Sequence, residues 1–201
     1  NSKLGFGLMR LPKDKQGNIQ IDEVQRMVDS FMGKGFNYFD TAYAYAGSEE
    51  AIKETLVKKY PRDSFTLADK LPAWKLKSQD DVQRIFTESL QLCGVDYFDF
   101  YLLHSIEKSH YPTYEKYQCF DFVKEMKKQG KIKYIGFSFH DDAQFLDKVL
   151  TEHPEMDFVQ LQLNYLDWEN GVIQSRQNYE VARKHQKPIV VMEPIKGGTL
   201  A

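Results

Sequence analysis

The feature that most constrains the fold is the regular spacing of short apolar segments. Successive segments start 33, 28, 33, 36, 24 and 31 residues apart, which is the length of one strand, one helix and their connections. Strands that are apolar on both faces indicate a parallel sheet covered by helices. The seven predicted strands begin at Leu4, Asn37, Phe65, Phe98, Tyr134, Phe158 and Ile189.

Helical segments separate these strands. The clearest follows Asp22, where four apolar residues recur at helical spacing before Gly33 and Gly35 end the pattern. We expect Ser48 to cap the second helix and Gly94 to end the third. The remaining predicted helices are residues 120–129, a segment opened by Asp141 or Asp142, and a segment that includes residues 179–185.

Polar residues recur where the predicted strands end. In a (β/α)8 barrel those ends converge on one mouth, whereas in an open sheet they lie along an edge. No Gly-x-Gly-x-x-Gly follows any strand, which counts against a Rossmann domain. We therefore favour a TIM-type barrel formed by residues 1–201 as a single domain, with the eighth strand and the last helices missing from this chain. The polar strand-end residues are Asp40, Lys70, His104, Ser138, Gln160 with Asn164, and Glu193.

Composition narrows the class of partner. The chain has 201 residues, is 42% hydrophobic and carries a formal charge of −2, so we expect a small-molecule partner and neither nucleic acid nor membrane. The sequence contains no apolar run of about 18 residues, and its first residues, NSKLGFG, lack the long apolar region that a signal peptide would have. Cys93 and Cys119 lie far apart and form no metal-ligand spacing, which favours free thiols and a cytoplasmic, soluble protein.

The stretch from Tyr38 to Glu50 holds the densest chemistry. A buried carboxylate such as Asp40 needs a cationic partner, and Lys70 ends the neighbouring strand. Tyr45 follows in the loop over the same mouth, where a nearby ammonium would make its hydroxyl a better acid. Tyr43 is a rival two residues away, which we interpret as a packing residue. His104 ends the fourth strand and would hydrogen-bond a substrate oxygen, unless it is a satisfied structural histidine.

Together these residues resemble the aldo-keto reductase family. The motifs that carry the resemblance are DTAYAYAGSEE with Asp40 and Tyr45, LADKLP with Lys70, and YLLH with His104. Their order and spacing match that family's tetrad, and the resemblance runs from Gly5 to Ala201. Other segments, such as KIKYIGFSFH and VVMEPIKGGTLA, look most like a bacterial branch whose longer members add a C-terminal segment with iron-sulfur-type cysteines, which is absent here.

The resemblance implies reduction of an aldehyde or ketone by hydride from a nicotinamide cofactor. Tyr45 would protonate the oxygen, Lys70 with Asp40 would tune Tyr45, and His104 would orient the carbonyl. The expected cofactor is NADPH, with NADH as the alternative. An iron-sulfur cluster is expected only if a longer C-terminus exists. The residues expected to contact the cofactor are Met9, Arg10, Asp40, Ser138, Gln160, Met192, Gly197 and Gly198.

Some positions depart from the family pattern. Phe139 stands where many relatives have an asparagine, Met192 replaces an aromatic residue, and Glu193 adds a charge. These departures keep open a second function, a cofactor-binding or regulatory protein on the same scaffold. A third, an aldolase with Lys70 as a Schiff base, is disfavoured because Asp40 keeps the amine charged. The sequence identifies neither the substrate nor the oligomeric state.

The long connection after the fourth strand is rich in aromatic residues. His110, Tyr111, Tyr114 and Tyr117 either form a substrate wall or pack over the rim of the barrel. We expect this connection to be a loop.

Overall fold

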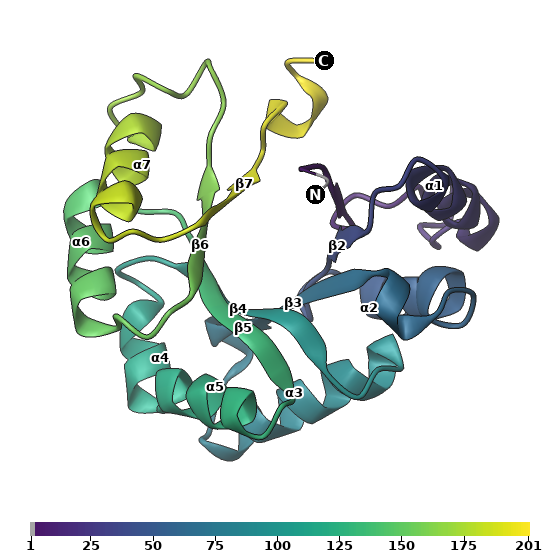
Figure 1. The fold of residues 1–201 in the computed structure, drawn as a ribbon, viewed down its shortest axis with the longest axis horizontal. Helices are drawn as coiled ribbons and strands as arrows, with labels where there is room; N and C mark the ends of the chain where they lie inside the picture. Colours follow the sequence, from purple (N-terminus) through teal and green to yellow (C-terminus); the bar gives the residue numbers. More distant parts are fainter. Residues whose placement is uncertain (1–2) are drawn as a thin grey trace.

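A computed structural model describes residues 3–201, which form one curled parallel sheet with helices around it (Figure 1). Each strand pairs in parallel with the next, in the order β1-β2-β3-β4-β5-β6-β7. The strands are β1 (Gly5–Gly7), β2 (Tyr38–Asp40), β3 (Thr66–Pro72), β4 (Phe98–Ile106), β5 (Ile132–Phe139), β6 (Phe158–Gln162) and β7 (Ile189–Met192).

The barrel prediction is confirmed, and each predicted strand start lies within two residues of the observed one. Continuous apolar segments mark strands well because a parallel sheet covered by helices buries both faces. In the part of the chain that the structure describes, β1 and β7 are the two edges of the sheet and do not pair with each other. The fold is therefore a (β/α)8-type barrel without its eighth strand.

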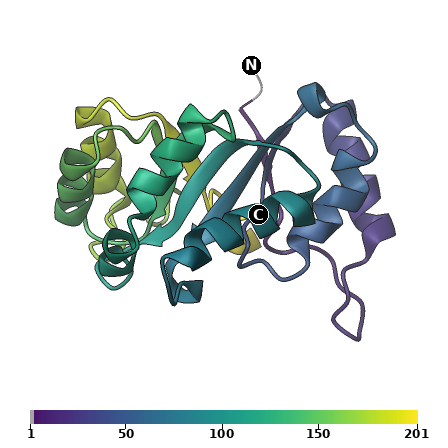
Figure 2. The ribbon, with the colours of Figure 1, turned by 90° about the horizontal axis from the view of Figure 1, so that it is seen from below.

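The helices lie on the outer side of the sheet (Figures 1 and 2). The short helix α2 continues directly into the π-helical segment η1. Within residues 3–201, none of the helices combines the length and the apolar character needed to cross a membrane. The helices are α1 (Ile21–Gly33), α2 (Ser48–Ile52), η1 (Lys53–Val57), α3 (Asp80–Cys93), α4 (Tyr111–Lys116), α5 (Cys119–Lys128), α6 (Ala143–Glu152) and α7 (Ser175–Lys184), with 3-10 turns η2 (Arg62–Ser64), η3 (Ala73–Lys75) and η4 (Lys196–Gly198).

Two of the predicted helix boundaries rest on observed caps. Asp142 is the N-cap of α6, and its carboxylate accepts a hydrogen bond from the backbone N–H of Phe145 at 2.9 Å. Gly94 ends α3 in the left-handed conformation, with φ of 71°, which costs little without a Cβ.

Two local predictions are wrong. Ser48 does not cap α2, because its buried hydroxyl lies 2.6 Å from the hydroxyl of Thr41 and bonds there instead. The connection after β4 is not a loop throughout, since Tyr111–Lys116 forms α4. A proline in its first turn supports that helix, and the hydroxyl of Tyr114 donates to the backbone oxygen of His104 at 2.6 Å.

Alternation along the strands separates two apolar regions. Side chains at odd positions of β3, such as Leu67 and Leu71, enter the large core between sheet and helices. Side chains at even positions, such as Ala68, belong to a smaller cluster with Leu102 and Phe158. The second cluster lies on the inner face of the barrel, so residues that share its parity point toward the interior.

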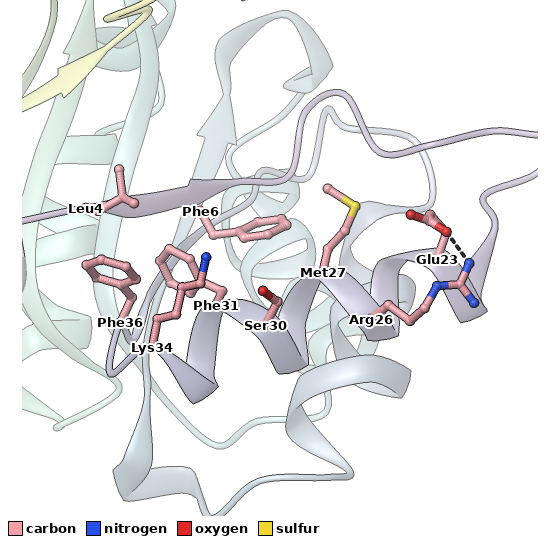
Figure 3. A pocket seen from close by; sticks show the side chains of 9 residues that line it. All are labelled: Leu4, Phe6, Glu23, Arg26, Met27, Ser30, Phe31, Lys34 and Phe36. Atoms are coloured by element: carbon pink, nitrogen blue, oxygen red, sulfur yellow. Dashed lines mark hydrogen bonds and ion pairs between the residues drawn. The ribbon is translucent and has the colours of Figure 1, made fainter.

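An apolar groove runs along the edge strand β1 and helix α1 (Figure 3). Leu4, Phe6, Met27 and Phe36 line it, and within residues 3–201 no strand pairs with the outer side of β1. In a closed barrel the eighth strand pairs with the first, so the groove lies beside the open edge. It contains none of the residues that the sequence predicts to carry chemistry.

Candidate active site

The predicted site residues lie at strand positions whose side chains point into the barrel. The Cα registers place Lys70 opposite Leu102 and Ser138 opposite Gln160 on neighbouring strands. Because parallel strands all end at one rim, their final inward side chains converge there. The inward residues near the ends of β2 to β6 are Asp40, Lys70, His104, Ser138 and Gln160.

The ion pair that the sequence predicts is present. The ammonium of Lys70 bonds to Oδ1 of Asp40 and donates to the backbone oxygen of Thr41 at 2.7 Å. The Lys70 side chain is only 1% exposed. Burial lowers the pKa of Lys70, but the charge of Asp40 opposes it and the net pKa is raised. Lys70 is therefore a buried ammonium that is charged at neutral pH and a poor nucleophile.

The second oxygen of Asp40 is also bonded. Its Oδ2 accepts a hydrogen bond from Nε2 of Gln160 at 2.9 Å and a longer one from the hydroxyl of Tyr38 at 3.4 Å. Gln160 pairs with a carboxylate rather than with backbone, the alternative for a strand-end glutamine. Donors from β2, β3 and β6 thus fix the Asp40 carboxylate under Lys70.

Tyr45 lies in the loop that follows β2. Its N–H donates to the backbone oxygen of Ala42, and its own backbone oxygen accepts from the N–H of Ser48, both at 2.9 Å. The Lys70 ammonium lies 4.9 Å from the centre of its ring. Burial raises the pKa of Tyr45, and the charge of Lys70 opposes the rise without reversing it. The charge of Lys70 therefore offsets only part of the effect of burial on the Tyr45 pKa. Tyr45 holds its proton at neutral pH.

His104 lies beside Tyr45 with its ring edge-on, at a centroid distance of 5.6 Å. Burial and the positive charge of Lys70 lower the pKa of His104 to about 3. Its Nδ1 atom is buried and has no hydrogen-bond partner among the described residues. The ring is therefore neutral and lies next to the phenol that sequence reasoning selected.

Tyr43, the rival phenol, takes a different position. Its hydroxyl donates to a carboxylate oxygen of Glu88 in α3 at 3.0 Å, and its ring packs against the core between sheet and helices. This geometry agrees with its interpretation as a packing residue. Tyr43 therefore lies outside the group formed by Asp40, Lys70 and Tyr45.

The candidate cofactor residues near β5 and β6 are ordered by hydrogen bonds. The buried Ser138 hydroxyl oxygen accepts from the backbone N–H of Ser105 at 2.7 Å, so its proton is free to be donated. Phe139 is 2% exposed and belongs to the helix-side core. Its side chain therefore faces the helices and not the interior of the barrel.

The candidate residues near β1 and β7 meet at the open edge. The guanidinium of Arg10 donates to Glu193 at 3.2 Å, which gives the unexpected charge of Glu193 a partner. Gly197 has a φ of 66°, and a Cβ there would lie 3.5 Å from the Arg10 guanidinium. Met9 is 57% exposed, while Met192 ends β7 and is partly exposed. Among the described residues, none of these forms a hydrogen bond or ion pair with the Lys70 ammonium, which is bonded to Asp40 and Thr41.

Sequence reasoning missed two residues that complete the site. Trp74 in η3 lies 5.1 Å from His104 and 5.1 Å from His110, measured between ring centroids, and is 46% exposed. The sequence signal that could have identified Trp74 is its position four residues after Lys70. Thr41 acts through its backbone oxygen, a role that no side-chain pattern reveals.

Known proteins resemble this chain in sequence and in fold. The model of the aldo/keto reductase family matches residues 3–201. Aldo-keto reductase str7 of Strobilurus tenacellus is 28% identical over 211 residues, which cover 99% of this chain and 60% of the relative. The NADH-specific methylglyoxal reductase of Escherichia coli is 27% identical over 189 residues, covering 83% of this chain and 56% of that protein.

A solved structure shares the fold. An aldo/keto reductase from Klebsiella pneumoniae in complex with NADP and acetate has a TM-score of 0.74 at 20% identity, and the match covers 98% of this chain and 66% of that one. The chain spans about 60% of the length of the str7 relative. The family match extends over the whole part that the structure describes, and on that ground the chain belongs to the aldo/keto reductase family.

Proposed function

We propose that the protein containing this chain reduces an aldehyde or ketone to an alcohol, using a reduced nicotinamide cofactor, with Tyr45 as the proton donor. The observation that carries the proposal is the meeting of Asp40, Lys70, Tyr45 and His104 at the mouth of the barrel. When bound there, the cofactor supplies the hydride.

Each residue of this group has a distinct task. Tyr45 keeps its proton at neutral pH because burial raises its pKa, so it can give that proton to the substrate oxygen. The Lys70 charge, 4.9 Å from the ring, stabilises the phenolate that remains. Asp40 holds Lys70, and Gln160 holds Asp40. Neutral His104 has one ring N–H, which we assign to orienting the carbonyl oxygen.

Two side chains support the fit of a nicotinamide carboxamide, which has one acceptor oxygen and an N–H2 group. The Ser138 hydroxyl has a free proton because its oxygen already accepts from Ser105. The N–H2 group of Gln160 donates to Asp40, and no hydrogen bond from another described residue reaches its side-chain oxygen, which can therefore accept. The donor and the acceptor lie at neighbouring positions of β5 and β6, which are paired in register.

The other end of the cofactor is assigned to the segment after β7. Gly197 and Gly198 both have positive φ, and no side chain covers the Cβ direction of Gly198 in the described structure. This leaves backbone room for a pyrophosphate. We propose NADPH as the cofactor, in agreement with the structural neighbour in complex with NADP. The relative named NADH-specific supports the alternative, NADH.

The test uses the full-length protein with NADPH or NADH and a panel of aldehydes and quinones. We expect nicotinamide oxidation that depends on the carbonyl compound. Calorimetry under the same conditions measures cofactor binding. Tight cofactor binding without turnover of any carbonyl would instead support a cofactor-binding or regulatory protein and would overturn the reductase proposal.

A further inference from the structure

A second cluster of reactive side chains lies on the opposite face of β3. Glu49 in α2, Asp69 in β3 and Cys93 at the end of α3 place their donor atoms within 4.8 Å of one another. Their exposed fractions are 3%, 0% and 0%. Because side chains alternate along a strand, Asp69 points toward the helices while Lys70 points into the barrel. The proposed reductase site does not use this cluster.

The two acids of the cluster lack a cationic partner. Oδ1 of Asp69 accepts from the backbone N–H of Lys70 at 2.6 Å, and its Oδ2 accepts a hydrogen bond from the thiol of Cys93 at 3.7 Å. Within residues 3–201, no lysine or arginine side chain bonds to Glu49 or Asp69, and the ammonium of Lys70 is engaged by Asp40 on the inner face. Two adjacent buried carboxyl groups must share a proton or bind a cation.

Unsatisfied polar atoms surround the same cluster. Oε1 of Glu49 and the hydroxyl of Ser89 are buried and lie close to each other, and neither has any other hydrogen-bond partner among the described residues. Ser89 is 0% exposed and lies one helical turn before Cys93 on the sheet-facing side of α3. A water or an ion beside these two groups would complete their hydrogen bonding.

We propose that Glu49, Asp69 and Cys93 bind a divalent metal ion of the zinc class, with Ser89 or a water as the fourth ligand. A tetrahedral zinc site with ordinary bond lengths has a sulfur-to-oxygen edge of about 3.5 Å, close to the 3.7 Å between Cys93 and Asp69. Thiolate favours zinc over magnesium or calcium, which prefer oxygen ligands alone.

The ion would be structural. It joins β3 to the two helices beside it, α2 and α3 (Figure 1), and lies on the face of the strand opposite the barrel interior. All three protein ligands are buried, so we expect the ion to enter as the chain folds and to add its binding free energy to that of folding.

The test uses the full-length protein, stripped of metal, and measures Zn²⁺ binding in competition with a chromogenic chelator. Cd²⁺ then replaces Zn²⁺, and the thiolate-to-metal charge-transfer band in the ultraviolet reports sulfur ligation. We expect Cys93→Ser to abolish the band of this site and to weaken its Zn²⁺ affinity at least about tenfold. The matched control, Cys119→Ser, removes the other free buried thiol and should leave both unchanged.

Two results with the cysteine variants would overturn the proposal. One is a wild-type protein whose Zn²⁺ affinity and Cd²⁺ band equal those of Cys93→Ser. The other is a band that disappears in Cys119→Ser instead. If Cys93→Ser does not fold, Glu49→Gln provides the test. This variant should retain the Cd²⁺ band and bind Zn²⁺ more weakly. Unchanged Zn²⁺ binding would mean that the two acids share a proton and would overturn the proposal.

Discussion

Removing the charge of Lys70 should slow the proposed reaction more than a loss of stability explains. Its ammonium lies 4.9 Å from the Tyr45 ring centre. At that distance and an effective dielectric constant of about 20, two unit charges interact by about 3 kcal/mol. This is the stabilisation that the phenolate loses in Lys70→Met, and it corresponds to a decrease in kcat of more than about 10²-fold.

The same substitution leaves Asp40 buried without its cation. Breaking a buried ion pair from one side costs about 3–5 kcal/mol of stability, although Asp40 keeps the donors of Gln160 and Tyr38. The double variant Asp40→Asn/Lys70→Met removes both charges, so we expect it to regain most of that stability. Its activity should remain as low as that of Lys70→Met, because the phenolate still lacks a cation.

The assay follows nicotinamide oxidation and urea unfolding for the wild type and the three variants Lys70→Met, Asp40→Asn and the double variant. Stability and turnover should separate in the double variant. If turnover recovers together with stability, the pair supports only the fold, and the role assigned to Lys70 is wrong.

Three further predictions follow from single contacts. The pKa of His104 is lowered to about 3 from 6.5, so the stability that neutral His104 contributes is present above pH 6.5 and is lost as the pH falls toward 3. Urea unfolding at several pH values should show a smaller loss of stability in His104→Gln than in the wild type. Trp74, 46% exposed beside His104, should act as an aromatic wall, so Trp74→Ala should raise KM for aromatic carbonyls with little change in thermal stability. Gly136→Ala would place a Cβ 2.6 Å from the backbone oxygen of Phe158 and should destabilise the fold by about 1–3 kcal/mol. The control is Gly7→Ala, also in a strand, whose Cβ would have no atom within 4 Å. Equal unfolding free energies for the two variants would contradict this prediction.

The strands and the inward residues were predictable because burial leaves a direct mark on sequence. A strand covered on both sides is apolar throughout, so a charge at its end, such as Asp40 or Lys70, stands out. The pairing of those two charges followed from their positions on neighbouring strands. Boundaries set by tertiary contacts were not predictable, as Ser48 shows, because its hydroxyl bonds to Thr41 rather than to its own helix.

Other contacts were hidden because they join distant parts of the chain. Gln160 reaches Asp40 across 120 positions in sequence, and this bond depends on the curl of the sheet. The balance of effects on Tyr45 was also hidden, because burial and the charge of Lys70 act in opposite directions, and only the structure gives the depth of burial. Cys93 appeared as an isolated thiol in the sequence because its neighbours Glu49 and Asp69 belong to other elements.

The most direct test of the central claim compares the two phenols of the loop after β2. In single-turnover experiments on the full-length protein with bound reduced nicotinamide, Tyr45→Phe should slow carbonyl reduction by at least about 10²-fold while cofactor affinity stays unchanged. Tyr43→Phe, whose hydroxyl contacts Glu88, should react at the wild-type rate. Equal rates for Tyr45→Phe and the wild type would contradict the assignment of Tyr45 as the proton donor.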